Sequence, residues 1–281
     1  MGAISLRSSL QGDEIRSGEV DFSLEKLIEQ LTIGGWPILL QDGIAQGIQY
    51  SRDYIDIIAG VEIKESSVQL QRPQKILRLL RSYARNISRE ASLKTLALDT
   101  AGTDYGSTSE TISIYLESLR RQFVIKDLPA WITHIRSSHT LRKSPKRHFT
   151  DPSLAIGALQ LSKEALMADL QYTGLLFESM VIRDLRIYAQ LYGGRVYHYR
   201  DSDGLEVNAI VEFPDGSWAA FEIKMGFGAQ EDGARNLLKL ADRIDYAKRK
   251  KPSLLAVITA NGFAYQRKDG VAVIPISVLT A

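Results

Sequence analysis

The chain has 281 residues, enough for two ordinary domains, and its 44% hydrophobic and 24% charged residues are typical of a globular protein with a core. It contains no cysteine, which excludes disulfides, thiolate metal sites and thiol catalysis. No segment approaches the ~20 apolar residues that span a bilayer, and the N-terminus lacks the apolar run of a signal peptide. We therefore expect a cytoplasmic protein without a membrane partner. The net charge of +2 gives no argument for nucleic acid by itself.

Residues 1–20 are polar and rich in glycine and serine, which predicts an arm or linker. Beyond them, apolar residues at helical spacing predict a series of amphipathic helices within a first domain, residues 21–150. The expected helices lie at 23–31, at 44–58, from 73 onwards, at 93–98 and at 109–121.

The last two of these helices are separated by a turn rich in glycine, threonine and aspartate, and a strand-like run follows at 122–128. Two helices and then a hairpin are the order of a winged helix. Thr111, Ser113 and Tyr115 would then lie near the presented side of the second helix. Such a domain reads DNA or serves only for protein contacts, and the sequence leaves both uses open.

A basic segment comes next, because residues 128–150 contain no acidic side chain. Its cations form a predicted DNA-binding cluster, made of Arg136, Arg142, Lys143, Lys146 and Arg147. Such a cluster can neutralise several phosphates. The alternative is a solvated loop or a docking face for an acidic partner. The three histidines of this segment have no neighbouring carboxylate, so we do not expect a metal site there. A second basic run covers 248–251.

Residues 151–281 predict a second domain that mixes helices and strands. It opens with a helix over 174–192, and Glu178 lies on the apolar stripe of this helix. A buried carboxylate must be paired, neutralised or bound to metal, so both a salt bridge and a functional site are open for it. The later elements are strands at 195–200, 205–213 and 217–224, a helix at 229–247 and a buried central strand at 254–259.

This order of elements resembles the core of the PD-(D/E)xK nuclease superfamily, a restriction-endonuclease-like fold. Period-two spacing places Glu222 and Lys224 on one face of the third strand. The resemblance implies that Glu222, a second-strand carboxylate and Glu178 of the helix hold Mg²⁺, a cation that prefers oxygen ligands. Lys224 would act with the metal to activate water and stabilise charge on the scissile phosphate.

The chain departs from this motif at the second strand, where Asn208 offers a carbonyl oxygen without a charge. Loss of that carboxylate should weaken Mg²⁺ binding and favours a weak or inactive nuclease. Glu206 and Glu212 share the strand face of Asn208 but lie two and four residues away from it. The candidate catalytic residues are Glu222, Lys224, Glu178 and Asn208, and the candidate metal ligands are Glu178, Asn208 and Glu222.

Several segments, taken in order, resemble a prokaryotic family of unknown function that forms the C-terminal half of AAA-type ATPases. They are Gly34-Gly35-Trp36-Pro37, 124–131, 141–147 and 177–181. The resemblance implies that a winged-helix-like region and a nuclease-like domain normally follow an ATPase domain. The chain has no Gly-x-x-x-x-Gly-Lys-Ser/Thr loop, so we expect no ATP binding. Residues 1–20 resemble the segment after the ATPase domain, which would be a partner in cis or in trans.

The sequence therefore predicts an α+β or α/β protein, with a helical, winged-helix-like N-terminal region and a restriction-endonuclease-like mixed-sheet domain. We expect a DNA-binding protein whose nuclease-like domain is a weak or inactive metal-dependent nuclease associated with an AAA-type ATPase. The alternative is a non-catalytic protein-interaction module that has lost the metal site.

Overall fold

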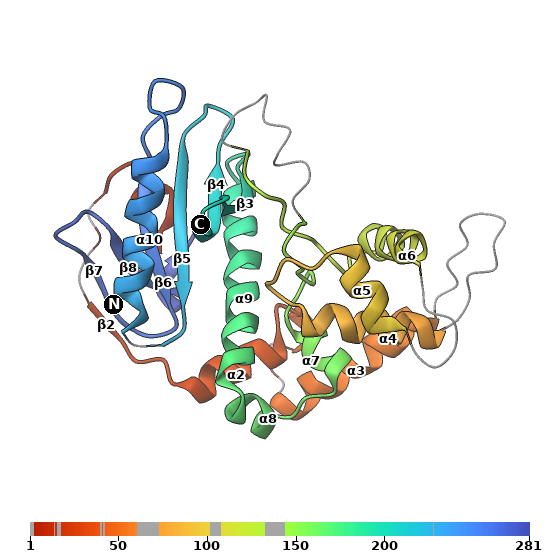
Figure 1. Ribbon diagram of the computed structural model, residues 1–281. Coiled ribbons are helices and arrows are strands. Elements are labelled where there is room, and N and C mark those ends of the chain that lie inside the picture. Colours follow the sequence, from red (N-terminus) through yellow and green to blue (C-terminus); the bar gives the residue numbers. More distant parts are fainter. Residues whose placement is uncertain are drawn as a thin grey trace. The chain divides into compact units, whose positions relative to one another are not determined.

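The computed structural model describes residues 3–13, 15, 18–39, 41, 43–60, 73–101, 108–132, 144–226 and 228–281. The chain divides into two compact units (Figure 1). The sheet unit comprises Met1–Leu27, Leu128–Lys143 and Met180–Ala281, and the helical unit comprises Ile28–Asp127 and Ser144–Ser179. Each unit is thus assembled from segments that are distant in sequence.

The helical unit consists mainly of short amphipathic helices with polar caps. The described helices are α2 (Leu24–Ile33), α3 (Ile44–Gly60), α4 (Pro73–Arg85), α5 (Leu93–Thr100), α6 (Ser109–Arg121), α7 (Ser153–Leu159), α8 (Lys163–Ala168) and the first half of α9 (Leu170–Gln190). Pro73 stands at the first helical position of α4, where its missing N–H is tolerated. The Ser92 and Thr108 hydroxyls accept backbone N–H groups and so begin α5 and α6.

The core of this unit is formed where α7 packs against α3 and α4, and where α5 packs against α4 and α6. Leu79, Leu80 and Tyr83 of α4 are fully buried there. A Cβ atom at Gly157 of α7 would lie 2.5 Å from the carbonyl oxygen of Ser51 on α3, so this close helix crossing requires glycine.

The five helices predicted in this region are confirmed, but the strand expected at 122–128 is not formed. Phe123 adopts a left-handed conformation with φ of 57°. The Val124 N–H then donates to the Leu119 carbonyl at 2.9 Å, which ends α6 with a turn. Ile125 forms only an isolated bridge with Phe149, so the described residues 122–132 contain no strand that could form a hairpin wing. Tyr115 is buried and is not presented on the surface.

The sheet unit contains a mixed seven-stranded sheet, in the order β2-β7-β8-β6-β5-β4-β3, among the described residues. The strands are β2 (Gly18–Val20), β3 (Arg195–Arg200), β4 (Glu206–Glu212), β5 (Trp218–Lys224), β6 (Leu254–Thr259), β7 (Gly262–Gln266) and β8 (Ala272–Pro275). An antiparallel meander joins β3, β4 and β5, whereas β5, β6 and β8 are parallel neighbours. The predicted meander and the central strand β6 are confirmed; β7 and β8 were not predicted.

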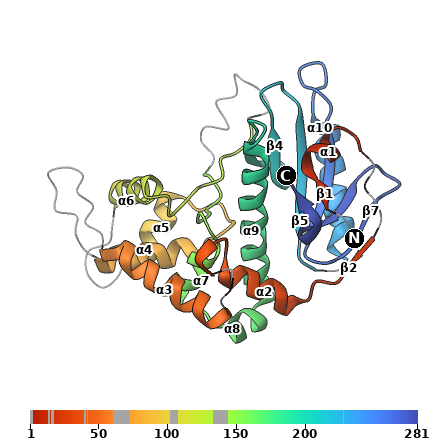
Figure 2. The ribbon, with the colours of Figure 1, turned by 180° about the vertical axis from the view of Figure 1, so that it is seen from behind.

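The N-terminal segment is part of this unit, although its composition predicts an arm or linker. Strand β1 (Ile4–Ser5) pairs in parallel with β9 (Leu279–Thr280) beside the C-terminus (Figure 2). Leu6, the first residue of helix α1 (Leu6–Leu10), is fully buried. Strand β2 pairs antiparallel with β7 and forms an edge of the sheet.

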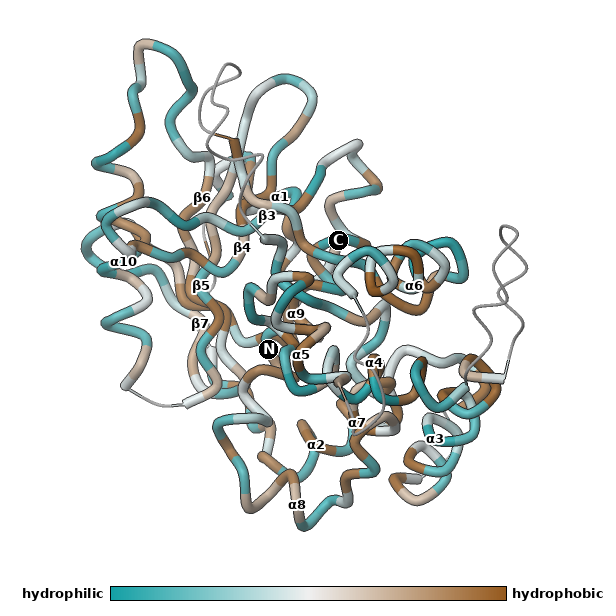
Figure 3. Tube along the Cα trace, turned by 45° about the vertical axis from the view of Figure 1, so that its right-hand side comes forward, coloured by the Kyte–Doolittle hydropathy of each residue, from teal (hydrophilic) through white to brown (hydrophobic). Residues whose placement is uncertain are grey.

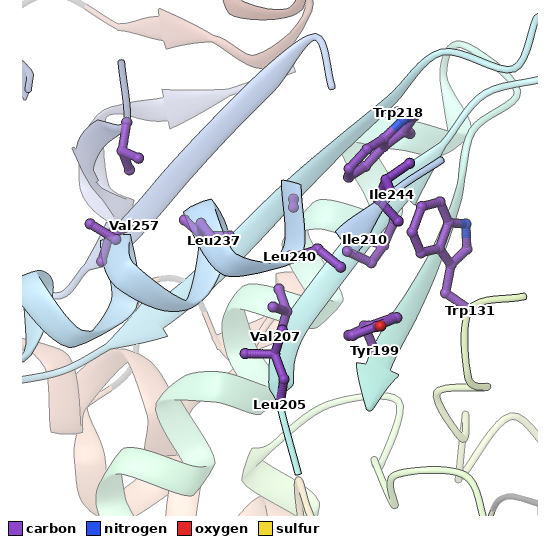
Figure 4. Packing of buried hydrophobic residues seen from close by; sticks show 13 residues of the cluster. Trp131, Tyr199, Leu205, Val207, Ile210, Trp218, Leu237, Leu240, Ile244 and Val257 are labelled. Atoms are coloured by element: carbon purple, nitrogen blue, oxygen red, sulfur yellow. The ribbon is translucent and has the colours of Figure 1, made fainter. Parts of the chain in front are cut away.

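Helix α10 (Ala229–Arg243) packs against β5 and β6, and its buried leucines meet the sheet in a hydrophobic cluster (Figure 4). Three aromatic rings lie at one end of the cluster, with ring centroids 4.9 Å apart for Trp131 and Trp218 and 6.3 Å apart for Trp131 and Tyr199. Hydrophobic residues predominate along the inner strands (Figure 3). The α+β class is therefore confirmed, with a helical N-terminal region followed by a mixed seven-stranded sheet.

Candidate functional site

Glu222 and Lys224 lie near the end of β5 and contact each other, as the period-two spacing predicts. Glu222 is 2% exposed, and its Oε2 atom lies 2.7 Å from Nζ of Lys224. Its Oε1 atom accepts a hydrogen bond of 3.4 Å from the side-chain amide of Asn236 on α10. The buried carboxylate therefore already has a cation and a hydrogen-bond donor as partners.

Asn208 of β4 has a structural role next to this pair. The regular pairing of β4 with β5 ends at Ala209 and Phe221. Beyond that point the Asn208 Oδ1 atom accepts a hydrogen bond of 2.9 Å from the Ile223 N–H. The amide side chain thus continues the ladder, and the oxygen predicted to be a metal ligand satisfies a backbone donor.

The two glutamates of β4 are also paired with cations. Glu206 forms an ion pair of 3.0 Å with Arg200 on β3. Glu212 forms an ion pair of 2.5 Å with Arg249, whose guanidinium also lies 4.4 Å from the centroid of the Trp131 ring. Neither glutamate replaces the missing second-strand carboxylate.

Glu178 belongs to the helical unit, whereas Asn208, Glu222 and Lys224 belong to the sheet unit. Glu178 is 8% exposed, and its Oε1 atom lies 2.9 Å from Nζ of Lys146. The salt bridge, one of the two roles that the sequence left open for this buried carboxylate, is therefore present. Its partner is Lys146, one of the cations predicted to bind DNA.

Arg147, the next predicted DNA-binding cation, is 2% exposed. Its guanidinium donates two hydrogen bonds to the Ala91 carbonyl, at 3.0 and 2.7 Å, and one of 2.8 Å to Asp127. Lys146 and Arg147 are thus each buried in an ion pair with a carboxylate, and neither side chain is exposed to bind a phosphate in this arrangement. The other three predicted cations, Arg136, Arg142 and Lys143, lie outside the described residues.

The basic run 248–251 is also largely compensated by acidic side chains. Lys248, Arg249 and Lys250 each form an ion pair, with Asp245, Glu212 and Asp215 respectively. The positive charge that this run could offer to a nucleic acid is therefore largely compensated in the folded chain.

The donors of the nuclease-like site do not fit a Mg²⁺ ion in this arrangement. Within the described ranges, no group of three or more histidine, cysteine, aspartate or glutamate side chains is placed to hold a metal. Mg²⁺ requires near-octahedral oxygen ligation. Here one carboxylate of the sheet unit is held by a lysine and the neighbouring amide oxygen by a backbone N–H.

A buried tyrosine beside Asp127 makes stability sensitive to alkaline pH. Burial raises the pKa of Tyr83 well above its ordinary value, and the adjacent Asp127 carboxylate raises it further. Burial likewise raises the pKa of Tyr199 in the sheet unit to about 12. Unfolded tyrosines lose their proton near pH ~10, so above that pH the folded state binds more protons. The free energy of unfolding should therefore be lost progressively as pH rises above about 10.

Urea denaturation across this pH range would measure the decline, and ultraviolet titration of the phenolate would follow the tyrosines. The Tyr83→Phe variant should decline less steeply than the unchanged protein, because its unfolded state has one tyrosine fewer to ionise. An equal slope in both proteins would contradict the role assigned to Tyr83.

The fold and these contacts define an α+β protein whose candidate carboxylates are paired with cations.

Residues 173–279 match the family described as domain of unknown function DUF4143. Residues 24–165, just over half of the 281-residue chain, match the family described as domain of unknown function DUF8612, and the chain belongs to this family. No curated protein and no solved structure matches the chain. None of the helices in the described ranges has the length and apolar character needed to cross a membrane.

Proposed function

We propose that the protein binds DNA and that its nuclease-like domain is a weak or inactive metal-dependent nuclease. The observation that carries the weak or inactive nuclease is that each carboxylate considered for the site has its own cation: Lys146 for Glu178, Lys224 for Glu222, Arg200 for Glu206 and Arg249 for Glu212. A carboxylate set that is already neutralised within the chain has little net charge left to attract Mg²⁺. Efficient metal-dependent hydrolysis is therefore not expected.

The succession of α9, the β3–β5 meander, α10 and β6 supports a PD-(D/E)xK-like fold for the second domain. The resemblance to the C-terminal half of AAA-type ATPases supports an ATPase domain as the partner, in cis or in trans. In that arrangement the ATPase would supply the energy-driven step, and the two units of this chain would contribute the contacts to DNA.

A non-catalytic protein-interaction module is the second candidate. The observation that favours it is the compensation of the predicted DNA-binding cations: Lys146 and Arg147 are buried in ion pairs, and three residues of the run 248–251 are paired with carboxylates. In this case the chain would dock to a protein and would not bind DNA.

The test is a binding and cleavage assay on single-stranded, duplex and branched DNA with Mg²⁺ or Mn²⁺, using the unchanged protein and Lys224→Ala. We expect binding that weakens steeply with salt and little or no cleavage. Efficient cleavage that disappears in Lys224→Ala would contradict the inactive site. Absence of DNA binding at low salt would favour the protein-interaction module.

Asn208→Asp should strengthen Mg²⁺ binding, because it adds a negative charge beside Glu222 and keeps an oxygen that can accept the Ile223 N–H. We expect an affinity about tenfold higher or more, equivalent to ~1.4 kcal/mol, measured by titration calorimetry. The control is Asn208→Asp combined with Glu222→Gln, which should lose the gain. Unchanged binding in the single variant would show that these residues do not share a metal site.

A further inference from the structure

The exposed face of helix α4 carries a stripe of three arginines. Exposed positions recur along the helix every three or four residues and so form one row: Gln74, followed by the arginines Arg78, Arg81 and Arg85. The opposite face is buried in the helical unit. Because the thirteen residues of α4 include no aspartate or glutamate, the helix itself offers no compensating charge.

The arginines of this stripe are poorly compensated by acidic side chains within the described residues. Neither Arg78 nor Arg81 forms a hydrogen bond or an ion pair within the described residues. Arg85 has only a long contact of 3.7 Å with Asp99, with the two side chains 53% and 35% exposed. Some exposed cations elsewhere, Arg235 and Lys250 among them, are paired with aspartates. Within the part of the chain that the structure describes, helix α4 therefore presents two unpaired arginines and one weakly paired arginine in a single exposed row.

This arrangement fits a row of phosphates. A planar guanidinium donates a fork of hydrogen bonds that matches phosphate oxygens. The seven residue steps from Arg78 to Arg85 rise by about 10 Å along an α-helix, which is the length of roughly three phosphate spacings along one strand of duplex DNA. Like charges at these spacings slightly destabilise a helix that has no counter-charge, and a bound polyanion would remove this small cost.

A lipid surface fits this helix less well than DNA. Helices that lie on membranes insert an apolar face between the lipids. The apolar face of α4 is already used in the core, where Leu79, Leu80 and Tyr83 are fully buried. The exposed side offers charge alone, which suits a polyanion.

We propose that the arginine face of α4, formed by Arg78, Arg81 and Arg85, binds the phosphate backbone of duplex DNA. The inference rests on the proposed function, because it assumes that the protein binds DNA, and it places the contact in the region that matches DUF8612. The contact is electrostatic and reads no sequence. Its residues belong to the helical unit, whereas those of the nuclease-like site on β4 and β5 belong to the sheet unit.

The experiment measures affinity for a labelled duplex by fluorescence anisotropy at several salt concentrations. The test variant is Arg78→Gln/Arg81→Gln in the full chain, and the charge-matched control is Arg235→Gln/Lys239→Gln on the exposed side of α10. Each lost phosphate contact lowers the slope of log affinity against log salt by ~0.9. We therefore expect the slope of the test variant to fall by about two, and the slope of the control to stay unchanged. Arg78→Lys/Arg81→Lys should keep most of the slope, because it keeps both charges.

The outcomes separate this inference from the proposed function. If the unchanged protein binds DNA and the Gln variant binds equally well with the same slope, the α4 site is overturned while DNA binding stands. If the unchanged protein does not bind DNA at low salt, both proposals fail. Binding of polyglutamate in place of DNA, lost in the Gln variant, would assign the face to an acidic protein and also overturn the proposal. A matching thermal melt of both Gln variants checks that the substitutions leave the fold intact.

Discussion

Replacing Lys146 by methionine should destabilise the helical unit by about 3–5 kcal/mol, the usual cost of removing one partner from a buried ion pair. The Lys146 and Glu178 side chains are only 7% and 11% exposed, with their charged atoms 2.9 Å apart. Without the ammonium group, the Glu178 carboxylate stays in a low-dielectric site without its counter-charge. Urea denaturation followed by far-ultraviolet circular dichroism would measure the loss, because the helices dominate that signal.

The matched control removes both charges, as Lys146→Met/Glu178→Leu. Apolar residues of similar volume often replace a buried ion pair without loss of stability, so the double variant should recover most of the difference. A double variant as unstable as Lys146→Met would show that packing, and not charge, accounts for the effect. Mg²⁺ gives a second readout: if Glu178 were a metal ligand, Mg²⁺ would bind the folded Lys146→Met variant and stabilise it. We expect no such rescue.

The elements that the sequence predicts well are those with a local signal. The α6 prediction matches the helix residue for residue, because Thr108 caps it and buried residues follow at helical spacing. The continuous apolar run 254–259 is the central strand β6 for a similar reason. Strands β1 and β2 have two and three residues, and their partners lie more than 200 residues away. Such short pairings leave no periodic pattern in the sequence.

The strand expected at 122–128 failed for a different physical reason. Its apolar and β-forming residues suit a strand, but Phe123 takes the left-handed conformation that ends α6. Glycine usually occupies this position, so a phenylalanine there does not predict a turn. The segment then pairs with 148–150 through only a few backbone bonds, Lys126 to His148 and Thr150 to Val124, and not with a strand of a wing.

The candidate site shows the same division between local and distant information. Period-two spacing was sufficient to place Glu222 beside Lys224. The partner Asn236 was missed, although Gly233 one turn earlier is a signal of close approach: a Cβ at Gly233 would lie 3.2 Å from Cβ of Glu222. The burial of Lys146 and Arg147 could not be read from the sequence, because a cation is buried only when a specific acidic partner from another segment meets it.

Asp127→Asn should be the second strongly destabilising substitution, again by about 3–5 kcal/mol. The Asp127 side chain is 9% exposed and lies between two arginines, with contacts of 2.8 Å to Arg147 and 2.9 Å to Arg120. It also accepts a hydrogen bond from the Tyr83 hydroxyl. An amide keeps the shape but removes the charge and brings an N–H₂ group towards these donors, so the 3%-exposed guanidinium of Arg147 would be left without an anion.

Glu117→Gln is the matched control, since Glu117 is the other carboxylate paired with Arg120 but is 53% exposed. An exposed ion pair contributes only ~0–1 kcal/mol, so the melting temperature of this variant should be close to that of the unchanged protein. Comparable losses of unfolding free energy in both variants would show that the unpaired charge of Arg120, and not the burial of Arg147, accounts for the destabilisation. If Asp127→Asn alone is strongly destabilised, then Arg147 is held for stability. On the proposal that the protein binds DNA, Arg147 would then be excluded as a phosphate contact, whereas the exposed arginines of α4 would remain candidates.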